Sequence, residues 1–294
     1  MSNQLKTILL LGSLSALLIA IGGAMGPDFL GYAVVSAAVM NLGAYFFSDR
    51  IVLASSGARE VTVEQAPELH AMVAELADQA GIPKPRVYIV PEAQPNAFAT
   101  GRSPQHAVVA VTEGILQLLD ARELRGVLAH ELSHVKNRDV LISSIAATVA
   151  AAVSYIARVA GFFGGERRDR EGPGGLESLL LLLVAPIAAT LIQFGVSRSR
   201  EFEADRSGAA LSGDPEALAR ALEKLEGGAQ AMPAQVQPAM ASLFIVNPFG
   251  AVRSVARLFS THPSTEERVR RLRAMETEVP APGAAWSSSA PTHL

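Results

Sequence analysis

The chain has 294 residues, of which 49% are apolar and only 18% charged, and its mean hydropathy is +0.27. This composition lies at the apolar limit of soluble proteins and indicates membrane-spanning segments. A formal net charge of −3 offers no basic surface for nucleic acid, and the lack of cysteine excludes disulfides, thiolate metal sites and cysteine nucleophiles. Any metal site must therefore use His, Asp and Glu.

Four apolar segments are each long enough to cross a bilayer as a helix, which takes about 20 residues. They cover residues 7–25, 29–47, 140–157 and 178–197. The first two carry no charge and are joined only by residues 26–28, which predicts a tight helical hairpin. The alternative for each segment is a buried helix of a soluble protein, and for the first, which follows Lys6, also a cleaved signal peptide. We expect four transmembrane helices.

The positions of Lys and Arg predict which side of the membrane the polar parts occupy. Positive charges flank one end of the apolar segments, whereas the 26–28 turn has none; they are Lys6, Arg50, Arg59, Lys136, Arg138, Arg198 and Arg200. Because positively charged flanks stay in the cytoplasm, both termini are expected there. The loop over residues 165–177 weakens this assignment, because it would place Arg167, Arg168 and Arg170 outside.

The rest of the chain forms two polar blocks, residues 48–139 and 198–277. The second pair of apolar segments, 140–197, separates them, and two crossings return the chain to the side it left. The two blocks can therefore combine into one domain. The last residues, 278–294, are rich in Pro, Ala and Ser and are expected to be disordered.

Local patterns within the two blocks predict a mainly α fold with a small β-sheet. Amphipathic spacing predicts helices over residues 67–79, 215–225 and 266–275, the last introduced by a capping box from Ser264 to Glu267. Runs rich in β-branched residues predict strands over 87–90 and 107–111.

The chemistry is concentrated in the run His130-Glu131-Leu132-Ser133-His134. On a helix, residues four apart lie on one face, so both imidazoles can reach one tetrahedral Zn²⁺ while Glu131 polarises the attacking water. A capping pattern at Asp120 and Glu123 and a helical apolar stripe support the helix; the stripe is Leu124, Val127, Leu128, Leu132 and Val135. The alternative is two solvent-facing histidines on an ordinary helix.

A third metal ligand is expected, because a catalytic zinc site has three protein ligands and one open position. The candidates are Glu201 and Asp205, which share a helical face just after the fourth apolar segment. One of them can bind the metal while the other orients a ligating imidazole. The alternative is a membrane-flanking charge cluster with Arg198 and Arg200.

Several spaced motifs resemble one family. They are residues 95–101 (Pro-Asn-Ala-Phe-Ala-Thr-Gly), 130–139, 201–205, and 261–264 with Glu267 and Arg268. Together with the two apolar hairpins they resemble the membrane zinc metalloproteases of the HtpX heat-shock type, which are related to the prenyl-protein endoproteases. The resemblance implies a zincin-like metalloprotease domain with one Zn²⁺ per chain, Glu201 as the third ligand and Asp205 as the partner of a ligating imidazole.

The resemblance also assigns residues around the metal. It implies that Asn96 and Ala97 lie on an edge strand that pairs with an extended substrate, and that His262 stabilises the oxyanion. For His262 the alternative is a histidine that simply precedes a helix. The resemblance further implies quality control at the bacterial inner membrane, with polypeptide substrates and no nucleic acid partner; the oligomeric state stays open.

The expected reaction is metal-assisted peptide hydrolysis with Glu131 as the general base. His134 shortly precedes the third apolar segment and Glu201 shortly follows the fourth, so at about 1.5 Å per helical residue the metal lies near the bilayer surface. That position favours membrane proteins or unfolded membrane-associated chains as substrates. A transporter would need more ionisable residues within the segments, and a non-catalytic zinc-binding membrane scaffold would not need Glu131.

Overall fold

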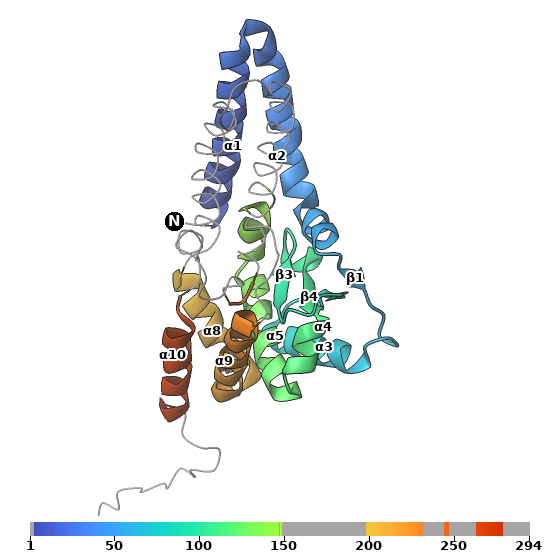
Figure 1. The fold of residues 1–294 in the computed structure, drawn as a ribbon, viewed down its shortest axis with the longest axis vertical. Coiled ribbons are helices and arrows are strands. Elements are labelled where there is room, and N and C mark those ends of the chain that lie inside the picture. Colours follow the sequence, from blue (N-terminus) through green and yellow to red (C-terminus); the bar gives the residue numbers. More distant parts are fainter. Residues whose placement is uncertain (1–2, 147, 149–197, 232–243, 247–262, 279–294) are drawn as a thin grey trace, which may run out of the picture.

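The computed structural model describes residues 3–146, 148, 198–231, 244–246 and 263–278. Two long helices, α1 (Asn3–Met25) and α2 (Pro27–Ser55), form a hairpin that projects from a domain of helices packed on a small sheet (Figure 1). The start of α1 and the end of α2 both lie beside that domain. The predicted N-terminal hairpin is therefore present, although α2 runs without a break beyond Phe47.

The turn between α1 and α2 depends on two residues with special backbones. Gly26 has φ 132°, a conformation that side chains rarely permit, and Pro27 begins α2 at the position where a missing N–H costs nothing. Within the described residues, α2 is long and apolar enough to cross a membrane, and α1 holds the shorter apolar stretch Thr7–Ala20. Residues 140–146 are helical, but most of 140–157 and all of 178–197 lie outside the described residues. The structure therefore provides one clear candidate span, and the four predicted spans are not confirmed.

The sheet has four strands in the order β1-β2-β4-β3. They are β1 (Arg59–Glu60), β2 (Arg86–Val90), β3 (Ala97–Thr100) and β4 (Val108–Thr112). β2 and β4 are parallel, and the two outer strands pair antiparallel to them. The two strands expected from β-branched runs are confirmed as β2 and β4. β1 was not predicted, because a strand of two residues is too short to show an alternation of apolar and polar side chains.

The predicted helices are also present, and most extend past their expected ends. The described helices of this domain are α3 (Pro67–Ala80), α4 (Glu113–Leu118), α5 (Ala121–Lys136), α8 (Arg198–Ser212), α9 (Pro215–Ala231) and α10 (Thr265–Glu278), with a 3₁₀ turn η1 (Pro104–His106). The capping box at Asp120 and Glu123 is formed as expected. At α10 the backbone N–H of Glu267 donates to the hydroxyl of Ser264, whereas the Glu267 carboxylate pairs with Arg270 and Arg271 instead.

The core lies between the sheet and helices α3, α5, α9 and α10, with α5 at its centre (Figure 1). The apolar stripe predicted on α5 is buried. Glu123 is only 1% exposed, and its carboxylate accepts a hydrogen bond from Nζ of Lys224 on α9 at 2.6 Å. This buried charge is thus paired, as burial requires. Helices from both polar blocks pack on α5.

A smaller apolar cluster fixes α2, the candidate membrane helix, to the sheet. Val52 and Leu53, near the end of α2, pack against sheet residues Val90, Phe98 and Val108. Both α2 side chains are almost fully buried. The end of α2 is therefore held firmly against the domain.

Gly208 sets how closely α8 approaches α5, and its replacement tests this contact. A Cβ at position 208 would lie 2.7 Å from the backbone nitrogen of His130 and 2.8 Å from its Cα. Gly208→Ala is therefore expected to lower the free energy of unfolding by about 1–3 kcal/mol and to weaken metal binding, because it pushes α8 away from α5. Gly227→Ala is the control, since a Cβ there meets nothing within 4 Å and alanine favours the helix. Thermal unfolding and metal content of both variants check the prediction, and equal behaviour would contradict it.

Candidate active site

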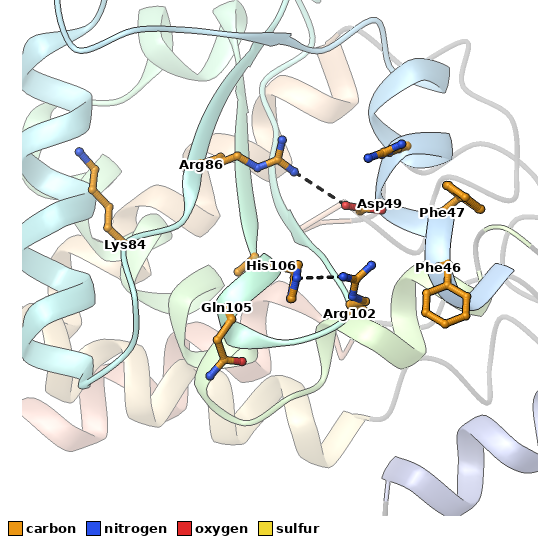
Figure 2. A pocket seen from close by; sticks show the side chains of 10 residues that line it. Phe46, Phe47, Asp49, Lys84, Arg86, Arg102, Gln105 and His106 are labelled. Atoms are coloured by element: carbon orange, nitrogen blue, oxygen red, sulfur yellow. Dashed lines mark hydrogen bonds and ion pairs between the residues drawn. The ribbon is translucent and has the colours of Figure 1, made fainter. Parts of the chain in front are cut away.

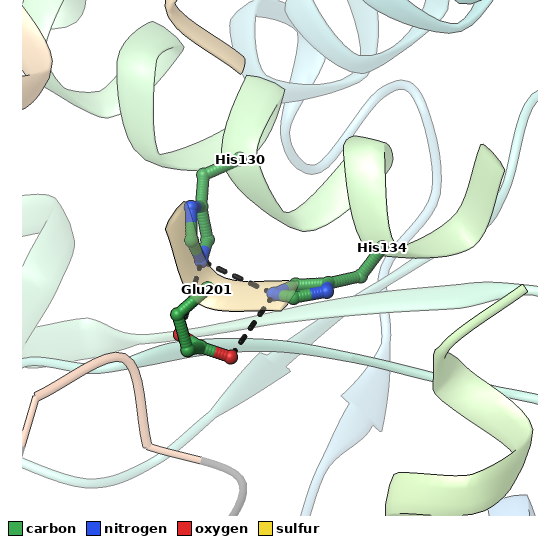
Figure 3. Close-up of side chains that lie close together, drawn as sticks. All are labelled: His130, His134 and Glu201. Carbon is green, nitrogen blue, oxygen red and sulfur yellow. Dashed lines mark hydrogen bonds and ion pairs between the residues drawn. The ribbon is translucent and has the colours of Figure 1, made fainter. Parts of the chain in front are cut away.

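Helices α5 and α8 bring His130, His134 and Glu201 together (Figure 3). The two imidazole Nε2 atoms lie 3.3 Å apart. Glu201 places one carboxylate oxygen 3.8 Å from Nε2 of His130 and the other 3.6 Å from Nε2 of His134. One ligand atom from each residue lies within 4.8 Å of the others. The two histidines therefore share one face of α5 as expected, and Glu201 from the second polar block meets them there.

His130 is supported from behind by a buried ion pair. Its Nδ1 lies 3.0 Å from a carboxylate oxygen of Asp205, one turn after Glu201, in an ion-pair contact. Asp205 in turn accepts two hydrogen bonds from Arg268, at 2.8 and 2.7 Å. Arg268 is 1% exposed and also donates to the carbonyl of Ile245 at 2.7 Å. The Asp205 carboxylate is therefore locked in place facing His130.

His134 is supported by Asp139, which lies just beyond the end of α5. Nδ1 of His134 is 3.3 Å from Oδ2 of Asp139, a buried carboxylate. Two backbone bonds close the helix: Arg138 N–H to the Val135 carbonyl, and Asp139 N–H to the His134 carbonyl. This is a Schellman motif, with Arg138 at φ 58° where glycine is usual. The chain reversal at Arg138 returns Asp139 to the ring of His134.

Glu131 lies beside the cluster and contacts the edge strand β3. Its carboxylate accepts a hydrogen bond from the backbone N–H of Ala99 at 2.9 Å, and only 6% of the residue is exposed. Its position is therefore set by two separate elements, its own helix and the sheet edge. A carboxylate held there can move a proton only to a group bound directly next to it.

The protein groups alone give the cluster an unusual electrostatic balance. Burial raises the pKa of Glu131 to about 7, and the charge of Glu201 adds to the rise. Burial lowers the pKa of His130, which favours the neutral imidazole. For His134, burial alone would lower the pKa, but the hydrogen bond to Asp139 and the charges of Glu201 and Glu131 outweigh it and raise the pKa to about 9. Only at His134 do the neighbouring carboxylates outweigh the effect of burial on the pKa.

The donor set fits a divalent metal of the zinc type. Nδ1 of each imidazole faces a carboxylate, so the Nε2 lone pairs are left for the shared point between the rings. Two imidazoles and one carboxylate make the three-ligand set of a catalytic site with an open position. The buried convergence of these ligand atoms agrees with a cation held by His130, His134 and Glu201.

The edge strand β3 lies next to this cluster. The carbonyl of Asn96 accepts from Thr112 N–H, so its backbone faces β4. Because backbone groups alternate along an antiparallel strand, those of Ala97 and Ala99 point away from β4, to the side where no described strand pairs with β3. Both residues are buried there, and the Ala99 N–H already donates to Glu131. The Asn96 side chain instead accepts from Ile245 N–H at 3.1 Å. Pairing of a substrate with β3 stays a prediction. In that prediction the backbone of Ala97 contacts the substrate directly, whereas Asn96 acts only by anchoring the strand.

The structure separates the predicted site residues into three groups. Five of them gather at the cluster, namely His130, Glu131, His134, Glu201 and Asp205. Asn96 and Ala97 lie at the nearby strand, and His262 lies outside the described residues. Sequence reasoning missed Asp139, Ala99 and the contact of Arg268 with Asp205. Asp139 and Arg268 are charged residues within the family motifs and could have been signalled in that way, whereas Ala99 contributes only a backbone N–H.

Comparison with known proteins shows which family the chain belongs to. A family model described as peptidase family M48 matches residues 63–276, well over half of the chain. The chain belongs to peptidase family M48. The family model covers both helices of the cluster and the edge strand. The chain is thus a metalloprotease, and the M48 assignment agrees with the resemblance drawn from its motifs.

Curated relatives agree with the M48 assignment over nearly the whole chain. A protein named Protease HtpX homolog from Sulfurihydrogenibium sp. is 54% identical over 284 residues, which is 92% of this chain and 96% of the relative. Another of the same name, from Syntrophobacter fumaroxidans, is 53% identical and covers 94% of this chain and 100% of the relative. The crystal structure of S. mikatae Ste24p aligns with a TM-score of 0.49 and 19% identity, over 89% of this chain and 62% of that one. The assignment rests on the family model and the curated relatives.

Replacement of Arg268 tests whether its ion pair with Asp205 supports metal binding at this M48 site. Arg268→Met leaves the buried Asp205 carboxylate unpaired and is expected to lower the free energy of unfolding by about 3–5 kcal/mol. Adding Asp205→Asn removes that unpaired charge, so the double variant should regain stability but still bind metal more weakly than wild type. Arg270→Met is the control, because its side chain is 74% exposed on the same helix. Chemical unfolding and metal titration measure both properties; full metal affinity in the double variant would show that Arg268 and Asp205 only stabilise the fold.

Proposed function

We propose that the protein is a zinc-dependent endopeptidase of the membrane that cleaves unfolded or membrane-associated polypeptides. The observation that carries this proposal is the buried convergence of His130, His134 and Glu201, with Glu131 beside them. Three ligands leave room for substrate, and a fourth residue is placed for proton transfer. The sequence alternative, a non-catalytic zinc-binding scaffold, gives no reason for a buried carboxylate at position 131.

Each side chain has a role in the proposed reaction. His130, His134 and Glu201 hold the metal, while Asp205 and Asp139 orient the two imidazoles. Zinc bound there supplies a Lewis acid that polarises the scissile carbonyl and lowers the pKa of water toward about 7. Glu131 takes a proton from the attacking water and returns it to the leaving nitrogen. His262 is proposed to stabilise the oxyanion.

Among the described strands β3 lies at the edge of the sheet, and this position supports an extended polypeptide as the substrate. A peptide that pairs with backbone groups of Ala97 is recognised through its own backbone, which is common to all sequences. Ala99 is already bonded to Glu131, so pairing along β3 would bring a peptide bond next to the general base. Broad sequence specificity follows from this mode of recognition.

The position of the site supports action at the membrane surface. Helix α2 is a candidate span, and its end is packed on the sheet next to β3. We propose that the protein is a multi-pass protein of the bacterial inner membrane, with the active site and both termini in the cytoplasm, and that it removes damaged membrane proteins there.

Hydrolysis of an unfolded protein by the purified chain tests the function. The detergent-solubilised wild type is expected to cleave casein, to lose this activity with a chelator and to regain it with Zn²⁺. A chain that binds zinc without cleaving casein or a membrane protein would favour the scaffold alternative.

The orientation is tested with single cysteines in this cysteine-free chain. In intact cells Ser103→Cys and Ser288→Cys should be protected from a membrane-impermeant thiol reagent, whereas Gly174→Cys should react, because the positive-inside rule places only the last outside. Labelling after lysis is the control for reactivity. Reaction of Ser103→Cys in sealed cells would overturn the cytoplasmic assignment.

A further inference from the structure

A basic pocket lies where α2 meets the sheet, on residues that the proposed peptidase mechanism does not use (Figure 2). It has a volume of about 460 Å³ and is built from three parts of the chain. The end of α2 contributes Phe46, Phe47, Asp49 and Arg50, the start of β2 contributes Lys84 and Arg86, and the turn after β3 contributes Arg102 and His106. Because Val52 and Leu53 dock α2 on the sheet, these parts keep a fixed geometry.

The pocket has an excess of positive charge. Four cationic side chains line it, against the single carboxylate of Asp49, which lies 3.8 Å from Arg86. Among the described residues, no carboxylate forms an ion pair with Arg50 or Arg102. Arg102 donates to Nε2 of His106 at 2.9 Å, a contact with no carboxylate partner. Two guanidinium groups are thus left to bind an anion.

Aromatic rings hold these two guanidinium groups at the apolar part of α2. Arg50 lies over the ring of Phe47 at 5.6 Å, and Arg102 over the ring of Phe46 at 5.8 Å. Figure 2 shows the Arg102 side chain between His106 and Phe46. Both phenylalanines are about half exposed, at 46% and 49%. Each of these contacts places an apolar ring directly beside a cation.

The pocket lies at the depth of lipid phosphates if α2 spans the bilayer. The apolar run over residues 29–47 ends at these two phenylalanines, and at 1.5 Å per residue it covers roughly 28 Å, close to the hydrocarbon thickness. Asp49 and Arg50 then fall in the headgroup layer. Exposed apolar side chains continue along α2 above the pocket, including Val39 and Leu42.

We propose that this pocket binds the phosphate group of an anionic phospholipid, with the guanidinium groups of Arg50 and Arg102 on the phosphate and the acyl chains along α2. Arginine suits this role, because its planar fork matches phosphate oxygens in two-point contacts. A basic pocket beside a membrane helix is also where anionic headgroups are expected to bind. A soluble phosphate ester offers the same phosphate chemistry but has no acyl chains to place on the exposed face of α2.

Native mass spectrometry of the full-length chain in detergent tests the proposal. The protein is incubated with equal amounts of phosphatidylglycerol and phosphatidylcholine, and retained lipids are counted. Wild type should retain phosphatidylglycerol preferentially. Arg50→Gln with Arg102→Gln should weaken that retention by roughly tenfold or more, because each cation near a lipid surface contributes appreciably to binding. Arg50→Lys with Arg102→Lys keeps both charges and should restore most of it, which also controls for folding.

Two further measurements test whether retention depends on this pocket and whether its ligand is a lipid or a soluble phosphate. Lys136→Gln with Arg198→Gln removes the same charge from exposed residues that flank the predicted spans but do not line the pocket, and should leave the retention unchanged. An equal loss in this pair, or equal retention of both lipids by wild type, would overturn the proposal. Glycerol 3-phosphate at millimolar concentration should not displace phosphatidylglycerol; full displacement would assign the pocket to a soluble phosphate and overturn the lipid assignment.

Discussion

Replacement of Glu131 by glutamine is expected to slow peptide hydrolysis by about 10²–10⁴-fold, the usual contribution of a general base, while zinc remains bound. The amide keeps the shape of the side chain, and its oxygen can still accept the hydrogen bond from Ala99 N–H. It cannot accept the proton of the attacking water. Because none of the three proposed ligands changes, metal content should equal that of wild type.

The measurement is the rate of casein cleavage at matched protein and zinc concentrations. Glu203→Gln is the control, because it makes the same change on a carboxylate that is half exposed and paired with Arg206 at 3.0 Å. The control should keep wild-type activity. Near wild-type cleavage by Glu131→Gln would show that another group carries the proton.

Removal of the Glu201 carboxylate is expected to abolish zinc retention and, with it, activity. Glu201 is 5% exposed and lies against both imidazoles, whereas Glu203 points roughly 200° away around the helix and pairs with Arg206. The expected order of damage is Glu201→Ala, then Asp205→Ala, then Glu203→Ala. Asp205→Ala should weaken zinc binding by about 10–100-fold, as expected for loss of a group that orients a ligand.

Zinc content and proteolysis of all three purified variants decide this order, with thermal unfolding to confirm that each is folded. Asp205→Ala also leaves Arg268 buried without its carboxylate, so its stability should fall most. An active, zinc-loaded Glu201→Ala beside a metal-free Glu203→Ala would reverse the ligand assignment.

Local periodicity explains why part of the site could be predicted from sequence. His130 and His134 converge because residues four apart share a helical face, and the capping pattern at Asp120 indicated where that helix begins. Glu201 and Asp205 were candidates for the same reason. Helical spacing alone could not decide between them; their assignment as ligand and supporting residue came from family resemblance, and the structure places Glu201 at the rings and Asp205 behind one of them.

The missed residues depend on contacts that no local pattern contains. Asp139 reaches His134 only because Arg138 adopts a left-handed conformation, where the sequence offers no glycine to signal a turn. Ala99 contributes a backbone N–H, which every residue except proline carries. Their roles follow from where the chain places them and not from their residue type.

The sequence by itself determined the chemistry of this protein: a cysteine-free set of histidines and carboxylates at helical spacing, beside segments apolar enough for a membrane. The tertiary structure decided how α5 and α8, which residues 140–197 separate in the chain, meet at one point. It also decided that Arg268 locks Asp205 and that the end of α2 forms a basic pocket with the sheet. The physical reason is range, because helix spacing and caps act within a few residues, whereas burial and ion pairing select partners far apart in the chain.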